Sequence, residues 1–353
     1  MKQATNPVSK KRRSGLLVAL ACAIAQVACT SSRDLVKDEV ELVVPITGAM
    51  RTASTPRDDH CTTDAVAILP FGWYHGLPQT AIEINHRNLM MIVDTGAMTT
   101  TLSPRAVAAL DAHEVNRRGA ATVDATGRVD YQPWAMLRSI RFGKYEFINH
   151  KALIGGIALP GHDADADAPQ GLIGADLLAR YDVEFDFPGR VIRLYDERAC
   201  RGHIPAWTEQ YETLVPDRII GNTFVIRLGL DGHPVDAVID TGASISVMSE
   251  SAAARAGVAT NALANDVRTS SFGVHDRAAT SHLHPFNTLE IGSVMYSRPL
   301  LSVMNAAGPG EDVLLGTDVL RRGRLWMSYS TKRVFIEGLS SDQRPFWVGR
   351  PKI

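Results

Sequence analysis

The sequence predicts a mainly β protein with two similar lobes and short helices. Strand-length segments with alternating or wholly apolar residues recur along the chain, and Gly- and Asp-containing turns separate them. The stretch "MMIVDTGAMTTTLS", residues 90–103, returns with the same pattern as "DAVIDTGASISVMS", residues 236–249. The length of 353 residues and the 45% hydrophobic content allow one to three domains with a sizeable core.

The repeat extends well beyond these two stretches. Before each Asp, "TAIEINHRNLMMIVD" and "TFVIRLGLDGHPVDAVID" predict a hairpin whose second strand ends at the Asp. After it, "SPRAVAAL" and "SESAAARAG" predict short helices, and "LRSIRFGKYEFINHKALI" and "LEIGSVMYSRPLLSV" predict two strands around a glycine turn. Finally, "GLIGADLLARYDVEFDFPGRVIRLY" is matched by "VLLGTDVLRRGRLWMSYSTKRVFIE". Matched anchors at nearly equal separations indicate a true repeat of about 140 residues.

This repeat sets the expected domain boundaries. They are a signal peptide at 1–28, a tether at 29–60, a first lobe at 61–200, a connector at 201–217, a second lobe at 218–345 and a C-terminal tail at 346–353. Within the tether, "EVELVVPI", residues 39–46, alternates well enough to predict a strand that joins a sheet shared between the lobes.

The N-terminus has the form of a bacterial export signal. Five basic residues precede the apolar run "GLLVALACAIAQVAC", which is too short to predict a membrane span. The run ends "VAC", so we expect cleavage and lipid attachment at Cys29, although Gln26 departs from the usual pattern. Cleavage after Ala25 and a twin-arginine signal in "KRRS" are the alternatives. We expect an exported, periplasmic protein with a lipid tether to the membrane.

The net charge argues against one kind of partner, and the cysteine positions suggest a disulfide. Loss of the basic leader makes the mature chain more acidic than the formal net charge of −1, which argues against nucleic acid as a partner. Cys61 and Cys200 bracket the first repeat, and we expect them to form a disulfide in an oxidising periplasm. By closing a long loop, it would stabilise the fold by up to about 4–5 kcal/mol. The alternative is two unrelated buried thiols.

The motifs "VDTGA" and "IDTGA", each followed later by "LIGADLL" or "LLGTDVL", resemble the aspartic peptidases. The Ala after the Gly is more similar to the retropepsin-like branch, and the resemblance covers about residues 61–340. It implies a two-lobed fold of two retropepsin-like β-barrel repeats, a peptide or protein substrate, and catalysis without a cofactor or metal. We expect a monomer in which one cleft lies between the lobes.

Asp94 and Asp240 are the candidate catalytic residues. A carboxylate at the end of an apolar strand is costly unless it is paired, hydrogen-bonded or protonated. Two carboxylates about 3 Å apart cannot both ionise easily, as the well-known aspartic-protease dyad illustrates, so one keeps a proton while the other activates water. Each half of the chain supplies one such Asp, and we therefore expect one shared dyad.

Neighbouring residues have supporting roles in this reading. Gly96 and Gly242 would let backbone amides approach the carboxylates. The resemblance implies that Thr95 and Thr241 hydrogen-bond across the pseudo-twofold axis. Asp176 and Asp318 are expected to cap or brace short helices behind the site rather than to take part in catalysis.

Ala97 and Ala243 stand where pepsins have a Ser or Thr that donates to the catalytic carboxylates. Loss of that donor removes one stabiliser of the charged form, so we expect the dyad to titrate higher. Activity should then favour mildly acidic to neutral pH.

Two segments are candidate flaps over the cleft. "TVDATGRVDY" in the first half predicts a hairpin with Gly127 at its tip. The corresponding segment "RTSSFGVHDRAATSH", which contains Gly273, looks longer and less regular. This inequality predicts an asymmetric cleft.

Two groups of residues could in principle bind a metal, but each is expected to have another role. "HDADADAPQG" begins like a calcium loop, but it lacks the Gly and the bidentate Glu that such a loop needs, so a solvated loop is expected. Three histidines in the second flap segment lack a framed ligand set and are expected to be structural or exposed: His275, His282 and His284.

The sequence thus predicts an aspartic endopeptidase that hydrolyses peptide bonds. The alternative is a non-catalytic peptide-binding or scaffold lipoprotein that retains the fold; intact Asp-Thr-Gly in both halves argues against it. An obligate homodimer would be needed only if the two halves failed to pair within one chain.

Overall fold

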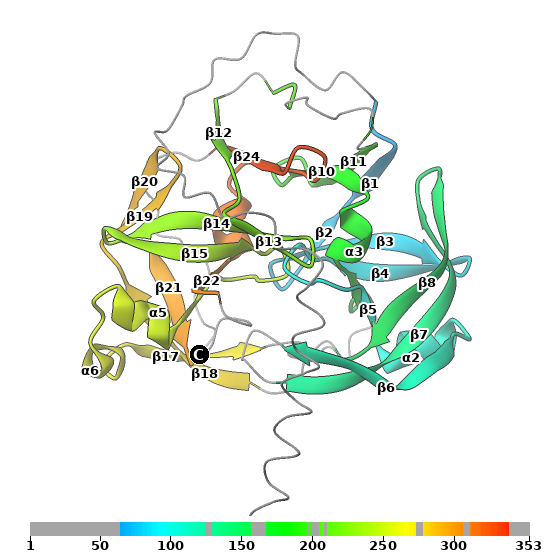
Figure 1. The fold of residues 1–353 in the computed structure, drawn as a ribbon, viewed down its shortest axis with the longest axis horizontal. Helices are drawn as coiled ribbons and strands as arrows, with labels where there is room; N and C mark the ends of the chain where they lie inside the picture. Colours follow the sequence, from blue (N-terminus) through cyan, green and yellow to red (C-terminus); the bar gives the residue numbers. More distant parts are fainter. Residues whose placement is uncertain are drawn as a thin grey trace, which may run out of the picture. The chain divides into compact units, whose positions relative to one another are not determined.

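A computed structural model describes residues 64–123, 129–156, 167–196, 198, 205–207, 210–272, 278–305 and 311–338. All of them lie in one compact unit, Met50–Ile353. The fold is mainly β with two repeated lobes, as the sequence predicts (Figure 1). The expected strand at 39–46 lies outside the described residues.

The first lobe is an eight-stranded sheet of order β2-β3-β4-β9-β5-β8-β7-β6. An additional pairing of β3 with β7 closes the strands between them into a ring. The elements are β2 (Gly72–Tyr74), β3 (Leu77–Ile84), β4 (Arg87–Val93), β5 (Thr101–Leu102), α2 (Pro104–Ala109), β6 (His113–Val123), β7 (Val129–Phe142), β8 (Tyr145–Ile154), β9 (Gly171–Ile173) and α3 (Ala175–Leu178).

The second lobe repeats this topology in the order β17-β18-β21-β16-β22-β15-β14-β19-β20, with β13 paired to β14. Two long strands of the first lobe are each divided here, and prolines at positions 285 and 299 lie at the breaks, where they cannot donate to a ladder. The elements are β13 (Arg218–Ile220), β14 (Thr223–Leu230), β15 (His233–Ile239), β16 (Val247–Ser249), α5 (Glu250–Arg255), α6 (Thr260–Leu263), β17 (Val267–Phe272), β18 (Ala278–Pro285), β19 (Thr288–Ile291), β20 (Val294–Ser297), β21 (Leu300–Met304), β22 (Val313–Leu315) and α7 (Thr317–Leu320).

A third sheet joins the two lobes. Its six strands run in the order β1-β11-β10-β23-β24-β12, and β10 of the first lobe pairs antiparallel with β23 of the second. The elements are β1 (Ala67–Pro70), β10 (Tyr181–Asp186), β11 (Val191–Asp196), β12 (Tyr211–Leu214), β23 (Arg324–Ser328) and β24 (Arg333–Glu337). A single apolar cluster with members from both lobes, including Phe185 and Leu325, lies beneath these sheets.

The local predictions around each Asp are confirmed. β3 and β4 form one hairpin and β14 and β15 the other, and each second strand ends one residue before the Asp. Helices α2 and α5 follow, and their N-terminal caps are equivalent: Ser103 Oγ accepts from Ala106 N, and Ser249 Oγ accepts from Ala252 N, both at 3.1 Å.

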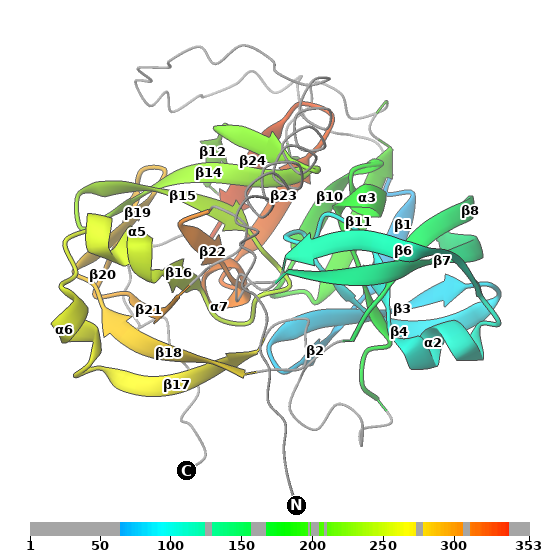
Figure 2. The same ribbon diagram turned by 60° about the horizontal axis from the view of Figure 1, so that its bottom comes forward.

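The arms of both candidate flap segments pair as hairpins, and the second is not less regular than the first, contrary to our expectation. The arms of the first, β6 and β7, contain register shifts near Asn116, whereas β17 and β18 pair without a shift from Val267 to Phe272 (Figure 2). The extra residues in β6 form bulges that the alternation of the sequence did not reveal. The tips that contain Gly127 and Gly273 lie outside the described residues. Among the residues that the structure does describe, no helix is both long and apolar enough to cross a bilayer.

Candidate active site

The two catalytic candidates occupy equivalent loops at the ends of β4 and β15. Asp94 N donates to Ile173 O and Asp240 N donates to Leu315 O, both at 3.0 Å, so the parallel pairings β4–β9 and β15–β22 hold each loop. Each Asp is 8% exposed. Both residues are therefore largely removed from water.

The threonines after each Asp join the two loops through four reciprocal hydrogen bonds. Thr95 Oγ1 donates to Ile239 O at 2.7 Å and accepts from Thr241 N at 3.1 Å. Thr241 Oγ1 donates to Val93 O at 2.6 Å and accepts from Thr95 N at 3.1 Å. Both threonines are fully buried. The bond across the pseudo-twofold axis that the resemblance implied is therefore present in both directions.

Gly96 and Gly242 bring each loop against the opposite carboxyl group. A Cβ atom added to Gly96 would lie 2.5 Å from Asp240 Cγ, and one added to Gly242 would lie even closer to Asp94 Cγ. Real side chains do not tolerate such distances, so only glycine fits at either position. This reciprocal packing brings the Asp94 and Asp240 carboxyl groups together at the junction of the lobes.

The two carboxyl groups differ in their environment. Burial raises the pKa of Asp94, while the Ala97 and Gly96 amides, which donate to Oδ1 at 2.9 Å, oppose the rise. The pKa of Asp240 lies well above its ordinary value, because of burial first and then the neighbouring Asp94 charge. The Gly242 amide, 2.8 Å from Asp240 Oδ1, and the Ala243 amide oppose this rise only in part. The arrangement favours an ionised Asp94 and a protonated Asp240. Burial is the main cause of both shifts, so they do not test the expected effect of Ala97 and Ala243.

Asp176 braces the first catalytic loop. It lies in the first turn of α3, where Ala175 N donates to Ala97 O at 2.7 Å. Asp176 Oδ1 accepts from Thr100 N and Oγ1 at 2.9 and 2.8 Å. His150 Nε2 lies 2.9 Å from Asp176 Oδ2. Sequence reasoning missed His150, because it lies on a distant strand with no local motif around it.

Asp318 has the equivalent place in the second lobe but a different environment. Its Oδ1 accepts from Ser246 Oγ at 2.7 Å, and Thr317 N donates to Ala243 O at 2.8 Å. Burial raises the pKa of Asp318. Asp176 and Asp318 thus hold the catalytic loops rather than cap the short helices as we expected, since glycine occupies the N-cap of both helices.

Each lobe also contacts the catalytic loop of the other through a hairpin turn, which the sequence did not predict. The β2–β3 turn places Gly76 beside Ser244, and its carbonyl accepts from Thr317 Oγ1 at 2.7 Å. The turn before β14 places Gly221 against Met98. Because both turns have left-handed backbone at the glycine, a larger residue would be strained as well as crowded there.

Other predicted site residues can be placed only in part. Cys29, Cys61, Cys200, Gly127 and Gly273 all lie outside the described residues, and so do His275 and the first two aspartates of "HDADADAPQG", Asp163 and Asp165; the third, Asp167, lies in an exposed turn. His284 Nδ1 lies 2.7 Å from Asp266 Oδ2, as expected for a structural histidine. Within the described part of the chain, no cluster of three or more His, Cys, Asp or Glu residues has the arrangement of a metal site.

The chain was compared with known proteins. A family model described as gag-polyprotein putative aspartyl protease matches twice, at residues 80–180 and 226–322, which together exceed half of the chain. No curated protein sequence matches. Among solved structures, the chain is similar to a retropepsin-like aspartic protease from Rickettsia conorii, with 22% identity and a TM-score of 0.27 over 36% of this chain and 89% of the other.

The two family matches coincide with the two lobes, and each contains one Asp-Thr-Gly-Ala loop and its downstream brace. The chain therefore belongs to the gag-polyprotein putative aspartyl protease family, and it contains two copies of the family's domain.

Proposed function

We propose that this protein is an aspartic endopeptidase in which Asp94 and Asp240 form one catalytic dyad across the lobes. The reciprocal packing of Gly96 and Gly242 against the opposite carboxyl groups carries the proposal. It brings two buried carboxyl groups together. Two backbone amides donate to Asp94 Oδ1 at 2.9 Å, and one, that of Gly242, donates to Asp240 Oδ1 at 2.8 Å. The substrate is a peptide or protein that binds between the lobes of a monomer.

The difference between the carboxyl groups assigns their roles. Asp94, which accepts two backbone amides, is the ionised member and removes a proton from the attacking water. Asp240, whose pKa burial and Asp94 raise most, holds the proton and donates it to the carbonyl oxygen of the scissile bond. The resulting tetrahedral diol then breaks its C–N bond as the proton on Asp94 passes to the leaving nitrogen. Both carboxyl groups return to their starting states when the diol hydroxyl returns its proton to Asp240.

The loops keep this geometry without a cofactor in the proposed reaction. Four hydrogen bonds from Thr95 and Thr241 fix the loops to each other, and the braces behind them fix each loop to its own lobe. Preorganisation of this kind lowers the barrier, because the reacting groups need not be brought into position during the reaction.

The purified chain should produce new peptide termini from a mixed peptide library, detected by mass spectrometry. A peptide with a tetrahedral hydroxyl group in place of the scissile carbonyl should inhibit it, because such a peptide mimics the diol. Binding of library peptides without any new terminus would instead support a non-catalytic peptide-binding or scaffold lipoprotein.

We also propose that the protein is exported to the periplasm and carries lipid on Cys29. Support comes from the basic leader and the "VAC" ending alone. The mass of the mature N-terminus tests this: an acylated Cys29 is expected, whereas an unmodified chain beginning at Gln26 would mean cleavage after Ala25. A Cys61–Cys200 disulfide belongs to the same proposal, and freely alkylated thiols in the unreduced, unfolded protein would exclude it.

A further inference from the structure

The strands that join the two lobes are equivalent strands of the repeat. The alignment that matches Gly174 with Gly316 also matches β10 with β23. In the shared sheet Glu184 lies opposite Trp326, which is its own equivalent in the second lobe. The junction therefore has the geometry of a two-fold symmetric interface. If two identical β10 strands paired in this register, Glu184 of one copy would lie opposite Glu184 of the other.

The residues on one face of this junction differ sharply between the lobes. The first lobe supplies the acidic triplet Asp182, Glu184 and Asp186, and the second lobe supplies the β23 triplet Arg324, Trp326 and Ser328. Across the junction, Asp186 lies opposite Arg324 in the ladder, and Ser328 Oγ donates to Asp182 Oδ2 at 3.2 Å.

The hydrogen bonds of Asp182 depend on residues that only the second lobe supplies. It is fully buried, and its carboxylate accepts from Ser330 N at 2.9 Å and from Ser330 Oγ at 2.7 Å, in addition to Ser328. The residues of the first lobe that are equivalent to Ser328 and Ser330 are Asp186 and Pro188. Neither an ionised carboxylate nor a proline nitrogen can donate a hydrogen bond. A second copy of the first lobe would therefore leave Asp182 without these three donors.

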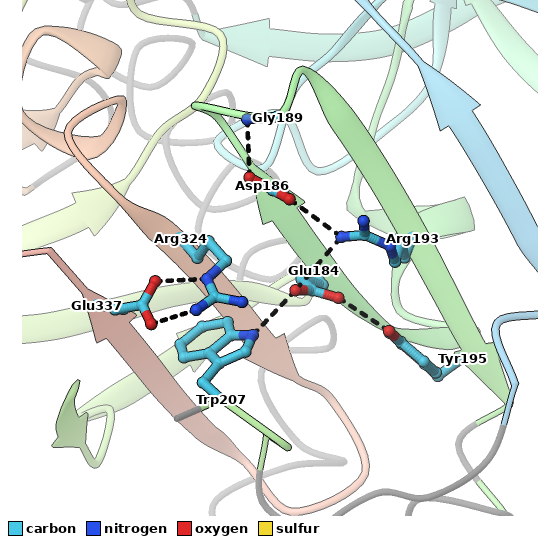
Figure 3. Close-up of polar contacts among 8 residues, drawn as sticks. All are labelled: Glu184, Asp186, Gly189, Arg193, Tyr195, Trp207, Arg324 and Glu337. Atoms are coloured by element: carbon cyan, nitrogen blue, oxygen red, sulfur yellow. Dashed lines mark hydrogen bonds and ion pairs between the residues drawn. The ribbon is translucent and has the colours of Figure 1, made fainter. Parts of the chain in front are cut away.

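Glu184 occupies the centre of the junction and is only 4% exposed (Figure 3). Trp207 Nε1 of the connector and the Tyr195 hydroxyl donate to it at 2.9 and 2.8 Å, and Arg193 lies 3.5 Å away. Opposite Glu184 the second lobe places the apolar ring of Trp326, which stacks on Tyr195.

On the other side of Trp207, the second lobe completes the network. The Arg324 guanidinium lies over the Trp207 ring, 5.0 Å from its centroid, and forms a bidentate ion pair with Glu337 (Figure 3). The connector indole thus lies between an acid of the first lobe and a cation of the second.

We propose that the two triplets are a specificity determinant through which the first lobe pairs with the second lobe and rejects a second copy of itself. Pairing of two β10 strands would oppose Glu184 with Glu184 and Asp182 with Asp186 on both sides. Three carboxylates from each copy would then meet, and two of them, Asp182 and Glu184, are buried in the present structure. Arg193 contacts both Glu184 and Asp186, but its single positive charge balances only one of the three negative charges in each copy. The desolvation and repulsion of the rest disfavour that assembly. The kind of partner that β10 fits is a strand with basic, aromatic and hydroxyl residues at alternate positions, which β23 provides.

Two matched pairs of variants in the full chain test this proposal without relying on catalysis. Trp326→Glu places an acid opposite Glu184, and Trp326→Gln removes the same indole without adding a charge. At pH 8 the ratio of unfolded to folded protein, from urea unfolding, should be at least about tenfold higher for Trp326→Glu, the size of one pKa unit of coupling. The difference should shrink toward pH 4 as the introduced carboxyl group takes up a proton.

Ser328→Asp and Ser328→Asn repeat the comparison with smaller side chains, in case loss of the indole unfolds both Trp326 variants. Ser328→Asp should be the less stable by a similar factor at pH 8 and should recover at acidic pH. Equal stability of the acid and amide variants at pH 8 would overturn the proposal, because lobe pairing would then be indifferent to a carboxylate on β23. Inactive parent protein would leave this comparison unaffected, so the proposed function and this inference can fail separately.

Discussion

Asp240 combines burial with a nearby like charge, and this combination makes its ionised form costly in the folded protein. Its pKa lies well above the ordinary value of 3.8, so the folded protein holds the proton more tightly than the unfolded chain does. The resulting stabilisation is complete below the unfolded-state pKa and is lost as the pH rises through the folded-state pKa. If Asp240 has the proposed catalytic role, we expect it to lower stability at neutral pH for the sake of function.

Asp240→Asn should therefore stabilise the protein at pH 7, by about 1 kcal/mol or more, since one pKa unit is worth about 1.4 kcal/mol. The amide keeps the shape and an acceptor for Gly242 N but never ionises. The gain should be smaller at pH 4 and should vanish at still lower pH, below the unfolded-state pKa of 3.8, where the parent carboxyl group is protonated in both states. Thermal unfolding of parent and variant at both pH values measures this; a gain of equal size at pH 4 would show that ionisation is not its cause.

At the scale of elements, the catalytic loops depend on glycine for their approach to each other. Gly242→Ala should push the Asp94 carboxyl group out of position, because the added Cβ would overlap it. We expect kcat to fall at least about 100-fold, the cost of a displacement of about 1 Å in a catalytic group. Gly72→Ala is the matched control, since a Cβ there meets no atom within 4 Å, and it should leave kcat unchanged. Unaltered kcat in Gly242→Ala would contradict the proposed placement of the carboxyl groups.

The local elements around each Asp could be predicted from the sequence, but the contacts between distant segments could not. Local patterns predicted the hairpins that end at Asp94 and Asp240 and the helices that follow, because turn residues and capping serines act over a few positions. They could not reveal His150 beside Asp176, since only the pairing of strands brings these residues together. The contact of Gly76 with the other lobe was hidden for the same reason.

The sequence was also a poor guide to strand regularity. The bulges near Asn116 insert extra residues into β6 relative to β7, and the alternation of the sequence does not mark them, because a bulge depends on the pairing of the two strands. By contrast, the duplication itself predicted the two-lobed architecture, because both halves had to place one Asp-Thr-Gly loop in the same setting.

At the scale of the whole molecule, each chain should build its own site from both lobes. Mixing the inactive Asp94→Asn and Asp240→Asn proteins should therefore restore no cleavage of the peptide library, at any concentration of the two chains. If lobes exchanged between chains, one of the two hybrid sites would contain both aspartates and activity would appear on mixing. Specific activity of the parent should likewise be independent of its concentration.

The proposed shared dyad is tested most directly by single and double substitution of its two carboxyl groups. Asp94→Asn and Asp240→Asn should each abolish cleavage of the peptide library while the protein stays folded, because an amide can neither take the proton of water nor donate one to the carbonyl as the acid does. The double variant should be no less active than either single variant, since groups that act as one unit are strongly non-additive. New peptide termini measured by mass spectrometry decide the matter: cleavage by Asp240→Asn equal to that of the parent would contradict a dyad shared between the lobes.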